Sequence, residues 1–219
     1  MEPLPHGYTN RTLRHGRTVT KAYLGPDAAE RRERELTALR ALRGRIPVPS
    51  VVDSGQELAM DLIEGDHGQE LIDAGRAAGV LRACGELLRR IHRIPPKDVL
   101  PDETGRVLVH GDYGPNNVLL DPATLEVVAV VDWEWTHIGD PIDDLAWCEW
   151  IVRAHHPRHV DCLGEFFDAY GERPAWSDRQ REMLTRQRSL VDFSERWEPG
   201  GAATQLWRRR IAATETWTE

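Results

Sequence analysis

Three short apolar runs separated by polar residues, within residues 107–132, constrain the fold of this chain more than any other feature. The runs are VLV at 107–109, VLL at 118–120 and VVAVV at 127–131. Apolar runs of this length, rich in valine, are typical of buried β-strands. The loop HGDYGPNN joins the first two runs, and its glycine, proline, asparagine and aspartate are ordinary turn formers. A role beyond turn formation therefore depends on what the rest of the chain supplies.

The first 63 residues predict a small β-rich lobe with one helix. The segment RTVTKAYL alternates so that Lys21 lies on a partly apolar face of a strand, and IPVPSVVDSG and ELAMDLIEG predict two further short strands. Residues 28–44 predict a helix that Gly44 ends, and Glu35 points the same way as its apolar stripe. The leucines of this stripe are Leu36, Leu39 and Leu42.

The remainder of the chain, residues 64–219, predicts a mainly helical lobe around the three apolar runs. Residues 77–94 have the apolar spacing of an amphipathic helix that ends before Pro95 and Pro96. Mostly helical sequence follows Asp132. The expected fold is therefore α+β in two lobes, residues 1–63 and residues 64–219.

Composition excludes several classes of protein. The chain has 28 Lys and Arg residues against 36 Asp and Glu, a formal net charge of -8 and no long basic run, so we expect no nucleic-acid partner. No apolar run approaches the length of a membrane span, and the N-terminus lacks the apolar core of a signal peptide. The three cysteines form no CxxC pair, which fits a reducing compartment. We expect a cytoplasmic protein; its oligomeric state is left open.

Five side chains stand out in this framework: Lys21, Glu35, Asp112, Asn117 and Asp132. Each alone has an ordinary explanation, such as a solvated lysine or a helix cap. Together they meet the needs of phosphoryl transfer from a nucleoside triphosphate, in which the protein mainly positions groups and stabilises charge. A cation held by a buried acid can bind phosphates, hard oxygen ligands can hold magnesium, and an oriented carboxylate can accept the proton of a hydroxyl.

The ordered motifs resemble the aminoglycoside phosphotransferase family, small-molecule kinases with the protein-kinase-like fold. The resemblance rests on His110-Gly111-Asp112 with Asn117, on Asp132-Trp133-Glu134, and on Gly139-Asp140-Pro141 leading to Asp144-Leu145-Ala146. Upstream, HGYTNR resembles the family's phosphate-covering loop, TVTKAYL its lysine strand, ERELTALRAL its glutamate helix and AMDLIEG its hinge.

The resemblance implies a role for each of these residues, with ATP and Mg²⁺ as cofactors. Asp112 would be the catalytic base, Asn117 and Asp132 the magnesium ligands, and Lys21, paired to Glu35, the ligand of the α- and β-phosphates. Further nucleotide contacts would come from the phosphate-covering loop and from the backbone of the hinge. In the hinge, the carbonyl of Asp61 and the N–H of Ile63 would contact adenine. These residues are Thr9 and Asn10 in the loop, and Asp61 and Ile63 in the hinge.

Two departures from protein kinases favour a small-molecule acceptor. Gly111 stands where a protein kinase carries an arginine before the catalytic aspartate, and Trp133-Glu134 replaces the Phe-Gly that opens a long activation segment. Only a few residues separate Asp132 from GDPIDDLAW, which leaves no room for a long switch loop. A constitutively organised small-molecule kinase is therefore the preferred interpretation.

The acceptor is encoded in residues 134–219, where the sequence is less informative. Glu134 and Glu149 are candidates to contact an amine-bearing natural product such as an antibiotic, and Glu134 could instead contact the metal shell or support the residues around it. The many tryptophans of this region are more typical of helix core than of a stacking surface. Two alternatives stay open: a metabolic or biosynthetic kinase of an amino alcohol or sugar, and a non-catalytic nucleotide-binding module.

Overall fold

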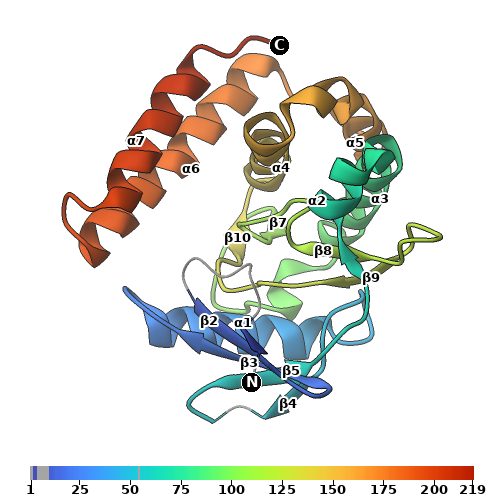
Figure 1. The fold of residues 1–219 in the computed structure, drawn as a ribbon, viewed down its shortest axis with the longest axis vertical. Helices are drawn as coiled ribbons and strands as arrows, with labels where there is room; N and C mark the ends of the chain where they lie inside the picture. The colour runs from blue at the N-terminus through green and yellow to red at the C-terminus, as the bar shows by residue number, and fades with distance from the viewer. Residues whose placement is uncertain (1, 4–9, 54) are drawn as a thin grey trace.

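The computed structural model describes residues 2–3, 10–53 and 55–219, which form a β-rich lobe and a mainly helical lobe (Figure 1). This arrangement confirms the α+β, two-lobed fold expected from the sequence. Thr9 lies outside the described residues, so its predicted nucleotide contact is not addressed by the structure. The predicted boundary after residue 63 stays a prediction.

The N-terminal lobe is an antiparallel sheet with one helix packed on it. The strand order is β1-β2-β3-β5-β4, and Gly16, at φ 60°, makes the turn between β2 and β3. The leucines of the predicted stripe are buried in the main hydrophobic core. The elements are β1 Glu2–Pro3, β2 Asn10–His15, β3 Thr18–Tyr23, α1 Ala28–Leu42, β4 Val51–Asp53 and β5 Leu58–Asp61.

The C-terminal lobe contains two small antiparallel sheets. The three predicted apolar runs form β7, β8 and β9, but β7 and β8 do not pair with each other: β7 pairs with β10, and β8 lies between β6 and β9. The loop at 110–117 therefore passes from one sheet to the other instead of closing a hairpin. The strands are β6 Asp66–His67, β7 Val107–Val109, β8 Val118–Leu120, β9 Val127–Val130 and β10 His137–Gly139.

Helices surround these sheets. The amphipathic helix predicted from residue 77 is α3, whose apolar face is buried against α5 and the core. The helical elements are α2 Gly68–Leu71, η1 Ile72–Arg76, α3 Ala77–Ile91, η2 Pro96–Asp98, α4 Pro141–His155, η3 Pro157–Cys162, α5 Leu163–Tyr170, α6 Trp176–Trp197 and α7 Ala202–Glu215. Among the described residues, no helix is long and apolar enough to cross a membrane.

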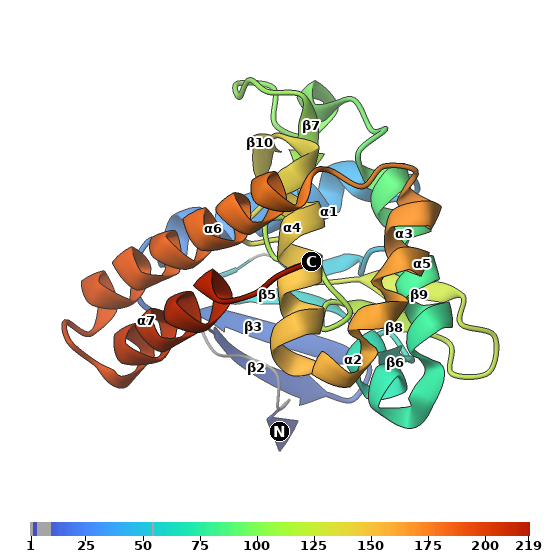
Figure 2. The same ribbon diagram turned by 90° about the horizontal axis from the view of Figure 1, so that it is seen from above.

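The last two helices form an antiparallel pair that packs on α4 (Figures 1 and 2). The indole rings of Trp147 and Trp150 are stacked 4.6 Å apart, and Trp207 of α7 packs against both. These three rings belong to a hydrophobic cluster between α4, α6 and α7. The core interpretation of the tryptophan-rich region is therefore correct for these three residues. The far end of α6 reaches the N-terminal lobe, where Arg196 pairs with Asp27 at 2.7 Å.

Candidate active site

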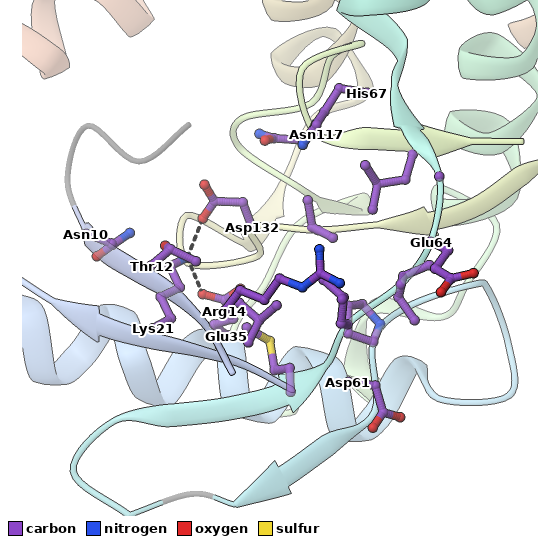
Figure 3. A pocket seen from close by; sticks show the side chains of 18 of the residues that line it. Asn10, Thr12, Arg14, Lys21, Glu35, Asp61, Glu64, His67, Asn117 and Asp132 are labelled. Carbon is purple, nitrogen blue, oxygen red and sulfur yellow. Dashed lines mark hydrogen bonds and ion pairs between the residues drawn. The ribbon is translucent and has the colours of Figure 1, made fainter. Parts of the chain in front are cut away.

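A cavity of about 500 Å³ lies between the two lobes (Figure 3). Strands β2, β3 and β5 form its floor, and the segment after β5 forms one end. The opposite wall consists of Asn117 in the loop before β8, Leu119 of β8, and Val131 and Asp132 after β9. Among its lining residues are most of the positions predicted for nucleotide and metal. These are Asn10, Lys21, Glu35, Asp61, Ile63, Asn117 and Asp132.

Lys21 lies at the centre of a carboxylate cluster. Its Nζ is 2.6 Å from Glu35 Oε2 on α1 and 2.5 Å from Asp132 Oδ1. The Tyr23 hydroxyl also donates to Glu35, at 2.5 Å. Burial opposes the charge on Lys21, but the carboxylates of Asp132, Glu35 and Glu134 outweigh it and raise its pKa. The strand and the helix predicted to supply this pair therefore bring it together as an ionised lysine held by a buried acid.

Glu134 also belongs to this cluster, with Oε2 3.8 Å from Lys21 Nζ. Both its oxygens accept hydrogen bonds from Asn10 Nδ2, at 3.0 and 2.9 Å, and Arg31 Nη1 of α1 donates to Oε2 at 2.8 Å. Its side chain is 1% exposed. An acceptor contact by Glu134 would have to displace these internal donors, so the geometry favours a supporting role for this carboxylate. Arg31 was missed, since nothing in its helical context distinguishes it from a surface arginine.

The loop after β7 brings Asp112 and Asn117 into direct contact. Asn117 Nδ2 donates to the backbone carbonyl of Asp112 at 2.8 Å and to its Oδ2 at 2.9 Å. The other carboxylate oxygen, Oδ1, accepts from the indole Nε1 of Trp147 on α4 at 2.7 Å. Both oxygens of Asp112 are thus held in place by single donors, which leaves each of them further lone pairs.

The pKa of Asp112 is raised to about 6. Burial is the largest cause, and the nearby charge of Asp132 adds to it. The Trp147 hydrogen bond, the cation of Arg186 and the Asn117 hydrogen bond act in the opposite direction. A carboxylate of this pKa is ionised at neutral pH and still basic enough to accept a proton, which suits a general base.

Asp144 of α4 holds the loop after β7 in place through hydrogen bonds to its backbone. Its two carboxylate oxygens accept the backbone N–H groups of His110, at 2.8 Å, and Gly111, at 2.9 Å, and Oδ2 is also 3.1 Å from His92 Nε2. Gly111 has φ 81°, and a Cβ there would lie 2.4 Å from the carbonyl oxygen of Trp135. Only glycine fits this position without strain, which gives a steric reason for the absence of an arginine.

The donor set fits a hard divalent cation such as Mg²⁺. Because the Asn117 amide nitrogen is used by Asp112, its Oδ1 is left toward the cavity, and Asp132 Oδ2 accepts no hydrogen bond from the described residues. Carboxylate and amide oxygens are the ligands that Mg²⁺ takes in such sites. Glu35 and Glu134 lie close enough to Asp132 to share an ion with it, but both are engaged by Lys21 and Arg31.

Glu149 does not belong to this site. Its side chain is fully buried, with Oε1 2.9 Å from Arg153 Nε and Oε2 2.7 Å from Arg179 Nε. These ion pairs join α4 to α6 and leave Glu149 no exposed surface for the predicted acceptor contact. Local sequence does not reveal the pairing with Arg179, which is 30 positions away and belongs to another helix.

The chain has the two-lobed, protein-kinase-like fold, with a cavity between the lobes. A model of the phosphotransferase enzyme family matches residues 1–106 and 98–184, and the chain belongs to this family. Both findings agree with the resemblance drawn from its motifs.

Individual relatives match this chain at low sequence identity or over only a part of their length. Aminoglycoside 3'-phosphotransferase of Streptomyces fradiae is 25% identical over 155 residues, 48% of this chain and 58% of the relative. Acyl-CoA dehydrogenase family member 11 of Pongo abelii is 44% identical over 87 residues, which are 39% of this chain and only 11% of that relative. The GDP complex of wild-type aminoglycoside 2'-phosphotransferase-IIIa matches with a TM-score of 0.77 at 14% identity, over 98% of this chain and 91% of that one. At that identity, the structural likeness shows the fold.

Proposed function

We propose that this protein transfers the γ-phosphoryl group of ATP, with Mg²⁺, to a hydroxyl group of a small molecule in the cytoplasm. The observation that carries the proposal is the convergence of the Lys21–Glu35 pair, Asp132 and Asn117 at one cavity between the lobes, with Asp112 hydrogen-bonded to Asn117. A non-catalytic nucleotide-binding module would not need an oriented base, two metal ligands and a buried lysine pair together.

The nucleotide would lie between the floor of the cavity and the Asn117 wall. Lys21 would bind its α- and β-phosphates once released from Asp132, with Glu35 holding the ammonium. Asn10 lines the same end of the cavity. The backbone carbonyl of Asp61 and N–H of Ile63 would bind adenine; in support, the neighbouring Leu62 N–H is already used by the Arg17 carbonyl, at 2.9 Å, which fixes the course of this segment.

Asp112 would act on the acceptor hydroxyl. Trp147 and Asn117 fix its two oxygens, so the carboxylate is oriented before the acceptor arrives. Its oxygen would take the hydroxyl proton as the hydroxyl oxygen attacks the γ-phosphorus. Magnesium, when bound through Asn117 and Asp132, would neutralise charge on the phosphate oxygens. The other contribution of the protein to catalysis would be to position the reactants, with Lys21 holding the phosphates and with Trp147 and Asn117 orienting Asp112.

The acceptor is best sought among small hydroxyl-bearing molecules, both antibiotics and metabolites. The names of the relatives favour an antibiotic first, and a metabolic kinase of a sugar or amino alcohol is the second candidate. The amine-bearing acceptor expected from the sequence has less support, because Glu134 and Glu149, the carboxylates assigned to it, are engaged internally.

The test begins with calorimetric titration of ATP and Mg²⁺ into the protein, followed by a screen of aminoglycosides, macrolides, sugars, sugar acids and amino alcohols for phosphate transfer from radiolabelled ATP. We expect Asp132→Asn to weaken magnesium-dependent ATP binding, and Asp112→Asn to lower transfer by about 10²–10⁴-fold with ATP binding kept. Asp168→Asn, on the exposed side of α5, is the matched control. ATP binding without transfer to any acceptor would instead favour the non-catalytic alternative, and no binding would reject both.

A further inference from the structure

Arg186 of α6 lies beside the candidate base. Its guanidinium carbon is 5.1 Å from the ring centroid of Trp135 and 5.8 Å from that of Trp147. Trp147 is the residue whose indole N–H binds Asp112 Oδ1 at 2.7 Å. The guanidinium therefore lies across one indole ring from the carboxylate that faces the acceptor, and its charge acts on that carboxylate.

The half-buried guanidinium of Arg186 lacks the partners that the two buried arginines, Arg31 and Arg179, have. Arg31 and Arg179 each bind a carboxylate at 2.8 Å or less, whereas Arg186 forms no hydrogen bond or ion pair through its side chain within the described part of the chain. Its Nε is inaccessible to solvent and has no acceptor among those residues. An arginine held in this way usually has an anion to bind, because its five N–H groups suit carboxylate and phosphate oxygens.

Longer-range charges do not supply that anion. Burial lowers the pKa of Arg186, and the carboxylates of Asp112, Asp144, Glu182 and Asp143 oppose this shift from a distance. Asp144 is engaged by the backbone of the catalytic loop, and Asp112 by Trp147 and Asn117. These groups keep Arg186 charged but do not use its N–H groups.

Arg186 also lies outside the nucleotide cavity. The residues that line that cavity include Lys21, Asn117 and Asp132, but neither Arg186 nor the two tryptophans beside it. Arg186 instead approaches Asp112 from α6, through the Trp147 ring whose N–H binds the carboxylate, and an acceptor that presents its hydroxyl to Asp112 from this side would meet the guanidinium.

We propose that Arg186 binds an anionic group of the acceptor, a carboxylate or a phosphate, and so holds its hydroxyl at Asp112. This inference rests on the proposed function and names its substrate class. The rings of Trp135 and Trp147 fix the guanidinium by cation–π contact and offer an apolar wall to the carbon skeleton. In the reaction the acceptor oxygen bonds to the γ-phosphorus, the bond to the β–γ bridging oxygen breaks with its electrons leaving on ADP, and the proton goes to Asp112. Arg186 takes part in none of these bond changes; it is a specificity residue.

The test compares acceptors that share a skeleton and differ in charge. One series is glycerol, glycerate, glycerol 3-phosphate and 3-amino-1,2-propanediol; the other is glucose, gluconate, glucose 6-phosphate and glucosamine. Steady-state ADP release is measured for the wild-type protein, Arg186→Met, Arg186→Lys and Arg188→Met, the last on the exposed side of the same helix. The carboxylate and phosphate members of each series distinguish the two kinds of anion.

We expect the wild-type protein to prefer an anionic member over its neutral partner, and Arg186→Met to remove this preference by raising KM about ten- to a hundredfold, the worth of a charge-assisted hydrogen-bonded pair. The assay is run at pH 8.5, where Asp112 stays ionised without the Arg186 charge, so that kcat should fall no more for the anionic member than for its neutral partner and the KM change should be confined to the anionic member. Arg186→Lys should recover part of the preference, and Arg188→Met should match the wild type. A preference for neutral or amine members would overturn the proposal. So would a fall in kcat for every acceptor alike, since that result would assign Arg186 to the transferred phosphoryl group.

A binding measurement decides the case in which none of these acceptors is turned over. Tryptophan fluorescence of the MgADP-bound protein is titrated with glycerate, gluconate and inorganic phosphate. A saturable change in the wild type that is lost in Arg186→Met supports the anion site, whereas its absence in the wild type rejects it. Failure of the proposed function would look different, because the protein would then neither bind MgATP nor phosphorylate a member of any charge.

Discussion

At the scale of single residues, the candidate site depends on how a few side chains share their hydrogen-bonding groups. Asn117 gives its amide nitrogen to Asp112, which leaves its oxygen for a cation, and Asp112 gives one oxygen each to Asn117 and Trp147. The same environment that orients Asp112 also buries it, and burial changes its acidity. Orientation and acidity of the base are therefore consequences of one arrangement.

The pH dependence of transfer follows from this burial. The pKa of Asp112 is raised to about 6, and the base must be ionised to accept a proton. We expect kcat/KM to fall as the pH drops through about 6, whereas an ordinary exposed aspartate would keep its activity to about pH 4. The measurement is a pH–rate profile from pH 4.5 to 8.5 with saturating magnesium. A limb near pH 4 would show that the Asp112 carboxylate is solvated in the active protein.

The same shift has a consequence for stability. Because the folded-state pKa of Asp112 is above the unfolded value, the ionised carboxylate disfavours the fold at pH values above about 6. Asp112→Asn should therefore unfold at the same or higher urea concentration than the wild type at pH 8. This variant then serves as an inactive but folded control for the profile above.

At the scale of elements, α4 links the site to the helices at the end of the chain. Its first turn carries Asp144, which binds the catalytic loop, its middle carries Trp147, and the next turn carries Glu149. One helix thus orients the base and anchors α6, the helix that brings Arg186 beside it. Displacing α6 should therefore affect the acceptor side without moving the nucleotide cavity.

Glu149→Ala tests the structural role that replaces its predicted substrate contact. The substitution leaves Arg179, which is 1% exposed, without its closest carboxylate, and breaking such a buried pair costs about 3–5 kcal/mol. We expect urea unfolding to show a loss of this size, with KM for the acceptor unchanged at temperatures where the variant is folded.

The matched control is Glu165→Ala, which removes the exposed ion pair with Arg82 on α3 and should change stability by about 1 kcal/mol or less. If Glu149→Ala instead raised the acceptor KM with unchanged stability, the result would support the acceptor contact predicted for Glu149 from the sequence.

At the scale of the whole molecule, the two lobes are held together by charged groups around the cavity. Lys21 and Arg31 belong to the N-terminal lobe, and their partners Asp132 and Glu134 follow β9 in the other lobe. A second, exposed pair joins Asp27 to Arg196 at the end of α6. The buried pairs lie next to the nucleotide cavity, so the stability of the lobe arrangement and nucleotide binding should be coupled.

Arg31→Met is expected to weaken this arrangement strongly. It leaves the buried Glu134 carboxylate near Lys21 without its main cation, at a cost of about 3–5 kcal/mol in the free energy of unfolding. ATP affinity should also fall, because an uncompensated carboxylate then lies near the phosphates. Arg196→Met removes the exposed pair and should leave the urea midpoint almost unchanged, because solvent screens such a pair. Equal losses in urea unfolding for the two variants would contradict a special role for the buried pair.

The sequence by itself determined the elements and the kind of chemistry. Apolar runs of strand length, the leucine stripe of α1 and the amphipathic α3 depend on local periodicity, which a linear sequence records. The spacing of Asp112 and Asn117 is likewise local, because both lie on one loop. Lys21 and Glu35 could be paired in advance only because the motifs as a set resemble a family in which they pair.

Tertiary structure alone decided which charged side chains face the cavity and which are engaged elsewhere. Glu134 and Glu149 were both candidates for the acceptor, and both are neutralised by arginines from other helices. Nothing in the local sequence distinguishes Arg186 from a surface arginine, and only the packing of α6 brings it against Trp135 and Trp147. The physical reason is that the energy of a buried charge depends on its partners in space, and those partners lie tens to more than a hundred positions away in the sequence.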